Sequence, residues 1–169
     1  MMCIAKAITS GYFPLGAAMI NARIAEAFET DTSGTAAIGH GYTYSGHPVG
    51  AAAALAALDE TRRLDVVGNA AARGTQLFDG MRALADTYEV IGDVRGGYGL
   101  MAAMELVSDR DTKTPIDGKL AIRMQKAAYD AGALIRVLGP NMIISPSLII
   151  DEADIDSVLN AIEAGLKIA

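Results

Sequence analysis

The chain has 169 residues, of which 51% are apolar and 20% charged, with a formal net charge of −6 and a mean hydropathy of +0.28. This composition suits a folded domain with a sizeable core and excludes an intrinsically disordered chain. The balance of 14 basic against 20 acidic side chains argues against nucleic-acid binding. A single cysteine excludes an intrachain disulfide framework, and no apolar run approaches the roughly 20 residues that span a bilayer. We therefore expect a cytoplasmic globular protein that does not enter a membrane.

The first part of the chain reads as two extended segments followed by two helices. Met1 to Ala5 is typical of the end of a buried strand, and Tyr12 to Ile20 of a second extended piece. A short helix is predicted from Ala22 to Phe28. Residues 29 to 46 are rich in glycine, serine and threonine, which indicates a long loop. A second helix is predicted from Pro48 to Arg63, because proline suits the first helical turn.

From residue 64 onward, helical and strand patterns alternate. Apolar residues with a period of 3.6 predict a helix from Val67 to about Asp86. Strands are predicted at Tyr88–Ile91, Leu100–Val107, Leu134–Val137 and Met142–Ile150, the last broken at Pro146. Asp117 and Asp151 are expected to cap two further helices, and residues 108 to 117 to form a polar hairpin or crossover loop. The fold class is therefore α/β.

Lys6 is the first residue that could carry chemistry, because an apolar strand delivers it into a small glycine-containing loop. A lysine amine becomes a nucleophile when desolvation or nearby cations keep it unprotonated, and a buried strand end supplies desolvation. The alternative is a surface lysine that extends from the strand end into water.

The loop from His40 to Pro48 is the second candidate, because it runs directly into a helix. Backbone N–H groups at a helix start, together with threonine and serine hydroxyls, suit a phosphate group. The alternative is an ordinary capping loop in which Ser45 or His47 satisfies free helix amides.

Arg136 is the third candidate, because it stands in an otherwise apolar strand. Its planar guanidinium suits a substrate carboxylate, while the alternative is a structural ion pair. Residues 95 to 99 are interpreted as a glycine-lined turn between strands. Two histidines and one cysteine provide no cluster at metal-ligand spacing, so no metal is expected.

Taken together, these segments resemble class III, pyridoxal-phosphate-dependent aminotransferases. Residues 5 to 17 resemble the cofactor-lysine segment of that family, and residues 40 to 48 its phosphate-contacting loop. Residues 95 to 103 are similar to the entry into its C-terminal domain. Arg136, with Gly139 and the Ser145–Pro146 pair, resembles the arginine strand of the amine:pyruvate, or omega-, aminotransferase branch. The resemblance covers essentially the whole chain.

The resemblance implies an α/β fold that is the C-terminal part of a fold-type I pyridoxal-phosphate-dependent transferase. Residues 1–63 would be part of the large cofactor-binding domain, with the cofactor lysine and an interdomain helix, and residues 64–169 the small C-terminal α/β domain. Family members carry, before the lysine, an acid for the pyridine nitrogen, a ring-stacking aromatic residue and a phosphate turn. Only five residues precede Lys6. We therefore expect an N-terminally truncated chain.

The resemblance also implies a role for each candidate residue. Lys6 would form the Schiff base with pyridoxal 5'-phosphate and move the substrate proton. Thr43, with the amide of Tyr42, would bind the cofactor phosphate in the partner's site of a homodimer. Arg136 would bind the carboxylate of an amino or keto acid. The implied activity is transamination of an amine or omega-amino acid with pyruvate as the amino acceptor.

Two alternative functions remain open. The isolated chain could be an inactive fragment or assembly module, whose apolar first strand and helix face at residues 51 to 58 await a partner. It could also belong to a related class III transaminase or aminomutase that uses 2-oxoglutarate or an internal amino group.

Overall fold

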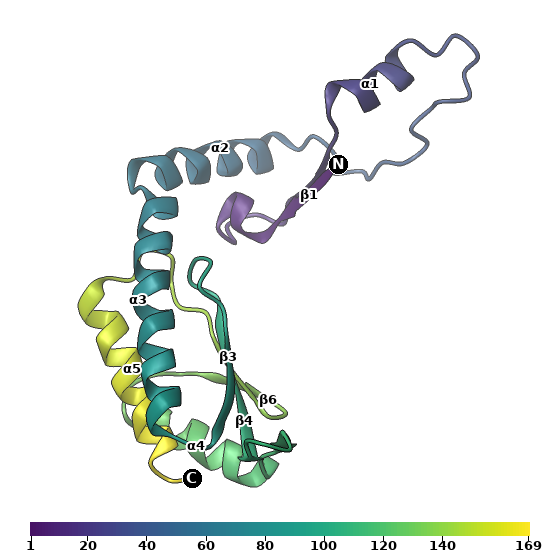
Figure 1. Cartoon of the computed structure of the whole chain (residues 1–169). Coiled ribbons are helices and arrows are strands. Elements are labelled where there is room, and N and C mark those ends of the chain that lie inside the picture. Colours follow the sequence, from purple (N-terminus) through teal and green to yellow (C-terminus); the bar gives the residue numbers. More distant parts are fainter. The chain divides into compact units, whose positions relative to one another are not determined.

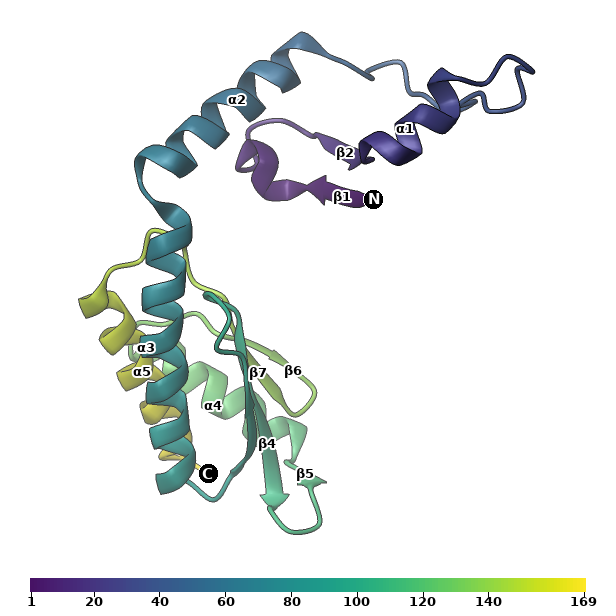
Figure 2. The same cartoon turned by 45° about the horizontal axis from the view of Figure 1, so that its top comes forward.

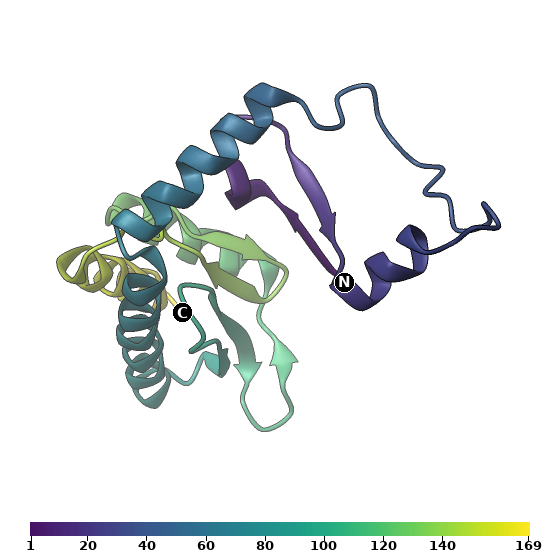
Figure 3. The ribbon, with the colours of Figure 1, turned by 90° about the horizontal axis from the view of Figure 1, so that it is seen from above.

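A computed structural model describes all 169 residues, which form two compact units, Met1–Leu64 and Asp65–Ala169 (Figure 1). The elements of the first unit are β1 (Met2–Ala5), the 3-10 turn η1 (Lys6–Thr9), β2 (Gly16–Met19), α1 (Ala22–Glu29) and α2 (Pro48–Arg63). Strands β1 and β2 pair in antiparallel fashion, and they run side by side in Figure 3. The two helices and the long loop between them confirm the prediction for this region.

Local hydrogen bonds explain where the two helices of the first unit begin. The Asn21 side chain caps α1 by accepting from the N–H of Ile24 at 3.1 Å. At the start of α2, His47 Nδ1 accepts from the N–H of Val49 at 3.2 Å. Pro48 follows as the first helical residue, where its missing N–H costs nothing.

The first unit has no hydrophobic core of its own. Thr9 and Gly50 are its only buried residues, and every position of β1 and β2 is exposed except the half-buried Ile4. The prediction that Met1 to Ala5 is a buried strand is therefore wrong for this chain. The reason is that its sheet has only two strands, and burial needs a wider sheet or a covering layer.

The second unit is a helix-on-sheet module (Figure 2). Its elements are α3 (Val66–Thr87), β3 (Ile91–Arg95), β4 (Ala102–Asp109), β5 (Thr114–Pro115), α4 (Gly118–Asp130), β6 (Arg136–Leu138), β7 (Asn141–Ile144) and α5 (Glu152–Leu166). The sheet order is β3-β4-β7-β6, with every pair antiparallel and β5 added to β4. The three helices lie on the same side of this sheet, so its other face carries no helix.

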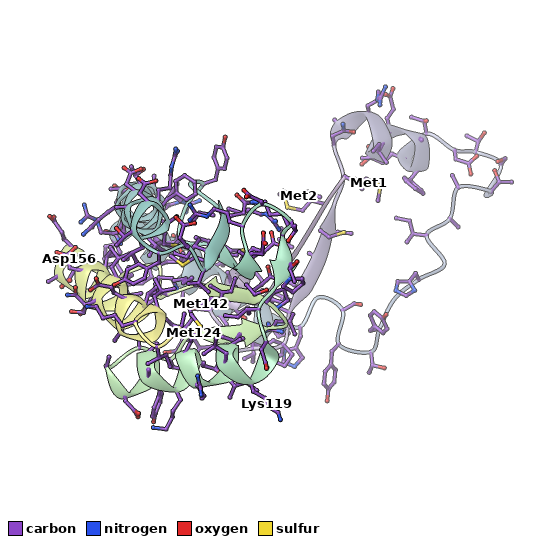
Figure 4. The ribbon with its side chains drawn as sticks, turned by 60° about the horizontal axis from the view of Figure 1, so that its bottom comes forward. Met1, Met2, Lys119, Met124, Met142 and Asp156 are labelled. Atoms are coloured by element: carbon purple, nitrogen blue, oxygen red, sulfur yellow. The ribbon has the colours of Figure 1, made fainter.

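The core of the second unit lies between its helices and its sheet. Met142 of β7 pairs with Met104 of β4, and neither side chain is accessible to solvent. Figure 4 shows Met124 of α4 and Met142 pointing into this interior, while Lys119 and Asp156 lie on the outside of their helices. Leu77 of α3 and Ile162 of α5 complete the same cluster. No helix in the chain is long and apolar enough to cross a bilayer.

All four predicted strands begin or end elsewhere in the structure. Strand β4 is Ala102–Asp109 and not Leu100–Val107, and β6 is Arg136–Leu138 and not Leu134–Val137. Tyr88 to Val90 form a turn, which the N–H of Ile91 closes by donating to the carbonyl of Tyr88 at 3.1 Å, and β3 starts only at Ile91. The Arg110 guanidinium donates to the carbonyls of Ala85, Tyr88 and Ile91 around this turn. Strand β7 ends at Ile144, since Pro146 has no N–H to continue the ladder.

The predicted hairpin, helix caps and glycine-lined turn of this unit are confirmed. Residues 108 to 117 form a hairpin, in which β5 pairs back onto β4. The side chain of Asp117 caps α4 through the N–H of Lys119, and that of Asp151 caps α5 through the N–H of Asp154. Residues 95 to 99 form the predicted glycine-lined turn between β3 and β4.

Glu163 of α5 gives a prediction about acid stability. It accepts hydrogen bonds from Lys167 Nζ and the Tyr88 hydroxyl, both at 2.9 Å, and these bonds hold its pKa below the ordinary value of 4.5. A lowered folded-state pKa adds stability above pH 4.5, and this stability is lost as the pH falls through the folded-state pKa. We expect Glu163→Gln to be less stable than wild type in urea at pH 7 and to approach it at low pH. Asp79→Asn, which removes an exposed, unpaired carboxylate on α3, should show no such convergence.

Candidate active site

Lys6 sits at the turn where β1 ends, and its backbone is in the left-handed region with a φ of 56°. This conformation is strained for a residue with a side chain, and such strain concentrates at functional positions. The side chain is exposed, and its amino group has no hydrogen-bond or ion-pair partner in the chain. The desolvation expected from a buried strand is therefore not provided within these 169 residues, and no other side chain of the chain engages the amine.

A short closed loop fixes the segment that follows Lys6. The buried Thr9 donates its hydroxyl to the carbonyl of Phe13 at 2.6 Å, so the loop folds back on itself. Ser10 and Gly11, at φ 50° and 83°, supply the left-handed backbone that this reversal needs. The turn η1 packs against α2, which ties the lysine segment to that helix.

Phe13 connects the lysine segment to the second candidate loop. Its ring centroid lies 5.3 Å from that of His47, the residue that caps α2. A Cβ added to Gly50 would lie 2.9 Å from the Phe13 ring, so only glycine admits the ring at this place. Sequence reasoning missed Thr9, Phe13 and Gly50 as supports of the site, although a glycine inside the alanine run of α2 was a visible signal.

The loop before α2 uses two of its polar residues for its own structure. Ser45 Oγ accepts from the N–H of Tyr42 at 2.9 Å, and His47 caps the helix. These contacts match the capping alternative for Ser45 and His47. They do not involve Thr43, whose hydroxyl is exposed and has no partner. Thr43 therefore remains available for a ligand, whereas the Tyr42 amide is engaged in the turn.

Arg136 is the first residue of the edge strand β6, directly opposite Ile143 of β7. Its side chain is exposed and makes no ion pair or hydrogen bond, so the structural ion pair considered from the sequence is not formed. Lys6 and Thr43 belong to the first unit and Arg136 to the second.

The three unpaired groups match the chemistry that pyridoxal phosphate and its substrates would need. A primary amine suits the cofactor aldehyde, a hydroxyl near a helix start suits its phosphate, and a guanidinium suits a carboxylate. Most other cationic side chains near strand and helix ends already form ion pairs with carboxylates, such as Arg95, Arg110 and Lys167. The residues present therefore fit this cofactor.

Comparison with known proteins identifies the family of the chain. Residues 1–166 match the family described as Aminotransferase class-III. An amine transaminase from an uncultivated Pseudomonas species, solved with pyridoxal phosphate bound, is 44% identical with a TM-score of 0.91, over 98% of this chain and 37% of that chain. The taurine–pyruvate aminotransferase of Bilophila wadsworthia is 34% identical, over 96% of this chain and 37% of its own length. The diaminobutyrate–2-oxoglutarate transaminase of Halomonas elongata is 35% identical, over 99% and 36%.

The chain therefore belongs to the class III aminotransferase family, whose members depend on pyridoxal phosphate. The predicted α/β class is confirmed, because the fold matches solved transaminases over nearly all of this chain. The chain spans a little over a third of the length of the relatives it matches.

Proposed function

We propose that this chain is part of an omega-aminotransferase that moves an amino group from an amine or omega-amino acid to pyruvate. The observation that carries the proposal is the strained, unpaired Lys6 at the end of β1, in a chain of the class III family. Pyridoxal phosphate, when bound, acts as the electron sink that makes the substrate's α-proton acidic. In this proposal, Lys6 Nζ attaches the cofactor and then carries that proton.

The other site residues bind the phosphate of the cofactor and the carboxylate of the substrate. Thr43 donates its hydroxyl to the cofactor phosphate of the partner subunit in a homodimer, with the amide of Tyr42 assisting once Ser45 releases it. Arg136 binds the carboxylate of the amino donor or keto acid through its planar guanidinium. Residues 1–63 would then form part of the cofactor-binding domain, and residues 64–169 the small C-terminal domain. The free thiol of Cys3 supports a cytoplasmic location.

The identity of the amino acceptor separates this proposal from its nearest alternative. One relative is named for pyruvate and another for 2-oxoglutarate, and an aminomutase would use an internal amino group. Assays of amine and omega-amino-acid donors against both keto acids, with pyridoxal phosphate present, test the choice. Alanine formed from pyruvate supports the proposal, while glutamate formed from 2-oxoglutarate alone contradicts it.

Arg136 gives a prediction about substrate recognition. We expect Arg136→Gln to raise the KM for a donor with a carboxylate by tenfold or more, since a charge-assisted, bidentate contact is lost, worth roughly 1.5–3 kcal/mol. The KM for a neutral amine should change little. Arg123→Gln removes a cation on α4 that also lacks an ion-pair partner, and it serves as the matched control. If Arg136→Gln raises the KM equally for both donors, Arg136 does not bind the substrate carboxylate.

A second function is favoured by the surface of the first unit. Its large apolar side chains are widely exposed, for example Met1 at 81%, Leu55 at 64% and Val49 at 57%. Surfaces of this kind mark protein–protein contacts or aggregation. The chain alone could then be an inactive assembly module of such an enzyme.

Light scattering combined with an absorbance scan distinguishes the two functions. A discrete dimer, or a complex with a complementing chain, that absorbs as bound pyridoxal phosphate supports the enzyme. A cofactor-free aggregate supports the module.

A further inference from the structure

The face of the second unit's sheet that carries no helix bears two arginines in one row across the strands. The pairing register sets Arg136 of β6 opposite Ile143 of β7, and Arg95 of β3 opposite Ala103 of β4. Ile143 and Ala103 are themselves opposite each other, so the four residues form one line. The adjacent line, Val137, Met142, Met104 and Val94, packs in the core. Because side chains alternate along a strand, the line of Arg136 lies on the open face.

The next line on the open face contains two carboxylates, and Arg95 binds both of them. Arg95 Nε lies 2.7 Å from Asp93 Oδ2, and its Nη2 lies 2.5 Å from Glu105 Oε2. Glu105 pairs with Asn141 of β7 in the register, so it lies two strands from β6. Of the two arginines on this face, Arg95 therefore pairs with two carboxylates, whereas Arg136 pairs with none.

Glu105 is the carboxylate that could compete for Arg136. The two residues are two strands apart and two positions apart along the strands, which places their Cα atoms about 12 Å apart from standard sheet spacings. An arginine and a glutamate on the same face can close that gap by extending toward each other. Asp93, by contrast with Glu105, has a second cation nearby, because both Arg95 and Lys113 lower the pKa of its carboxyl group.

If Arg95 is removed, the partial burial of Glu105 favours an ion pair with another cation. Its side chain is only 27% exposed, and a half-buried carboxylate that loses its partner is costly. Arg136 is the remaining cation in the two lines of the open face. The Glu105–Arg95 pair therefore keeps a carboxylate away from Arg136.

We propose that Arg95 is a positioning residue, which holds Glu105 so that the Arg136 guanidinium stays free for a substrate carboxylate. The second half of this statement rests on the proposed function of Arg136. The first half concerns only side chains of the second unit, and it can be measured without substrate or cofactor.

The direct test follows hydrogen exchange at Arg136 Nε–H by NMR in the 169-residue chain. We expect Arg95→Gln to slow this exchange roughly tenfold, because Glu105 then accepts a charge-assisted hydrogen bond from Arg136. The double variant Arg95→Gln/Glu105→Gln should restore the wild-type rate, and Arg95→Lys should stay close to it. An unchanged rate in Arg95→Gln overturns the proposal. The Arg95 side chain is 63% exposed, and Arg95→Met keeps its aliphatic stem as a second replacement if Arg95→Gln does not fold.

Kinetics of the cofactor-loaded enzyme test the link to substrate. Arg95→Gln should raise the KM for a carboxylate donor roughly tenfold, leave that for a neutral amine unchanged, and be rescued by Glu105→Gln. If Arg136→Gln raises the carboxylate KM but Arg95→Gln does not, the positioning role is wrong. If Arg136→Gln also has no effect, the fault lies with the proposed role of Arg136, and the exchange measurement still decides whether Arg95 restrains Glu105.

Discussion

Replacing Lys6 by alanine is expected to abolish covalent attachment of pyridoxal phosphate and to lower transamination by about a thousandfold or more, because both the attaching amine and the proton carrier are lost. Borohydride reduction of the protein with pyridoxal phosphate, followed by digestion and mass spectrometry, measures the attachment. The wild-type chain should carry the pyridoxyl mass on the peptide that contains Lys6, and Lys6→Ala should carry none there.

Lys119 provides a matched control for this experiment. It is an exposed lysine of α4 whose amino group, like that of Lys6, has no ion-pair partner. Lys119→Ala should therefore keep both the label and the activity of wild type. Labelling spread evenly over Lys6, Lys119 and other surface lysines would show that Lys6 has no special reactivity, and the assignment of the cofactor lysine would then fail.

The largest loss of stability is expected from Gly74→Ala in α3. A Cβ at this position would lie 2.2 Å from the carbonyl oxygen of Gly99, in the turn between β3 and β4. Because the obstacle is backbone and not a flexible side chain, helix or turn must shift, at a cost of about 3 kcal/mol. The midpoint of urea unfolding, followed by circular dichroism, should fall accordingly.

Gly118→Ala is the control that separates the clash from the general effect of replacing glycine. Gly118 begins α4, and no heavy atom lies within 4 Å of the Cβ position. Alanine restricts the unfolded chain and favours a helix, so this variant should be more stable by about 0.5 kcal/mol. A loss of stability in Gly74→Ala no larger than the ordinary scatter of surface substitutions, about 0.5 kcal/mol, would mean that α3 and the turn do not approach so closely.

Much of the second unit could be predicted from the sequence, because its signals are local. The capping aspartates Asp117 and Asp151 stand at the first turns of α4 and α5, and the apolar period of α3 extends over most of its length. Strand ends were less predictable. At the start of β3, the carbonyl of Ile91 accepts a hydrogen bond from Arg110, which lies 19 residues further along the chain. Such a contact leaves no trace in the local pattern.

The sequence alone also determined the family, since Lys6, Thr43 and Arg136 stand in segments that resemble it, and that family is confirmed. Only the tertiary structure decided which of their neighbours are already engaged. It showed the Tyr42 amide bound to Ser45, Phe13 seated against Gly50, and Arg95 holding Glu105 on the sheet face of Arg136. Residue type and spacing determine what a side chain can do, but its free partners depend on which distant strands pair, and in what register.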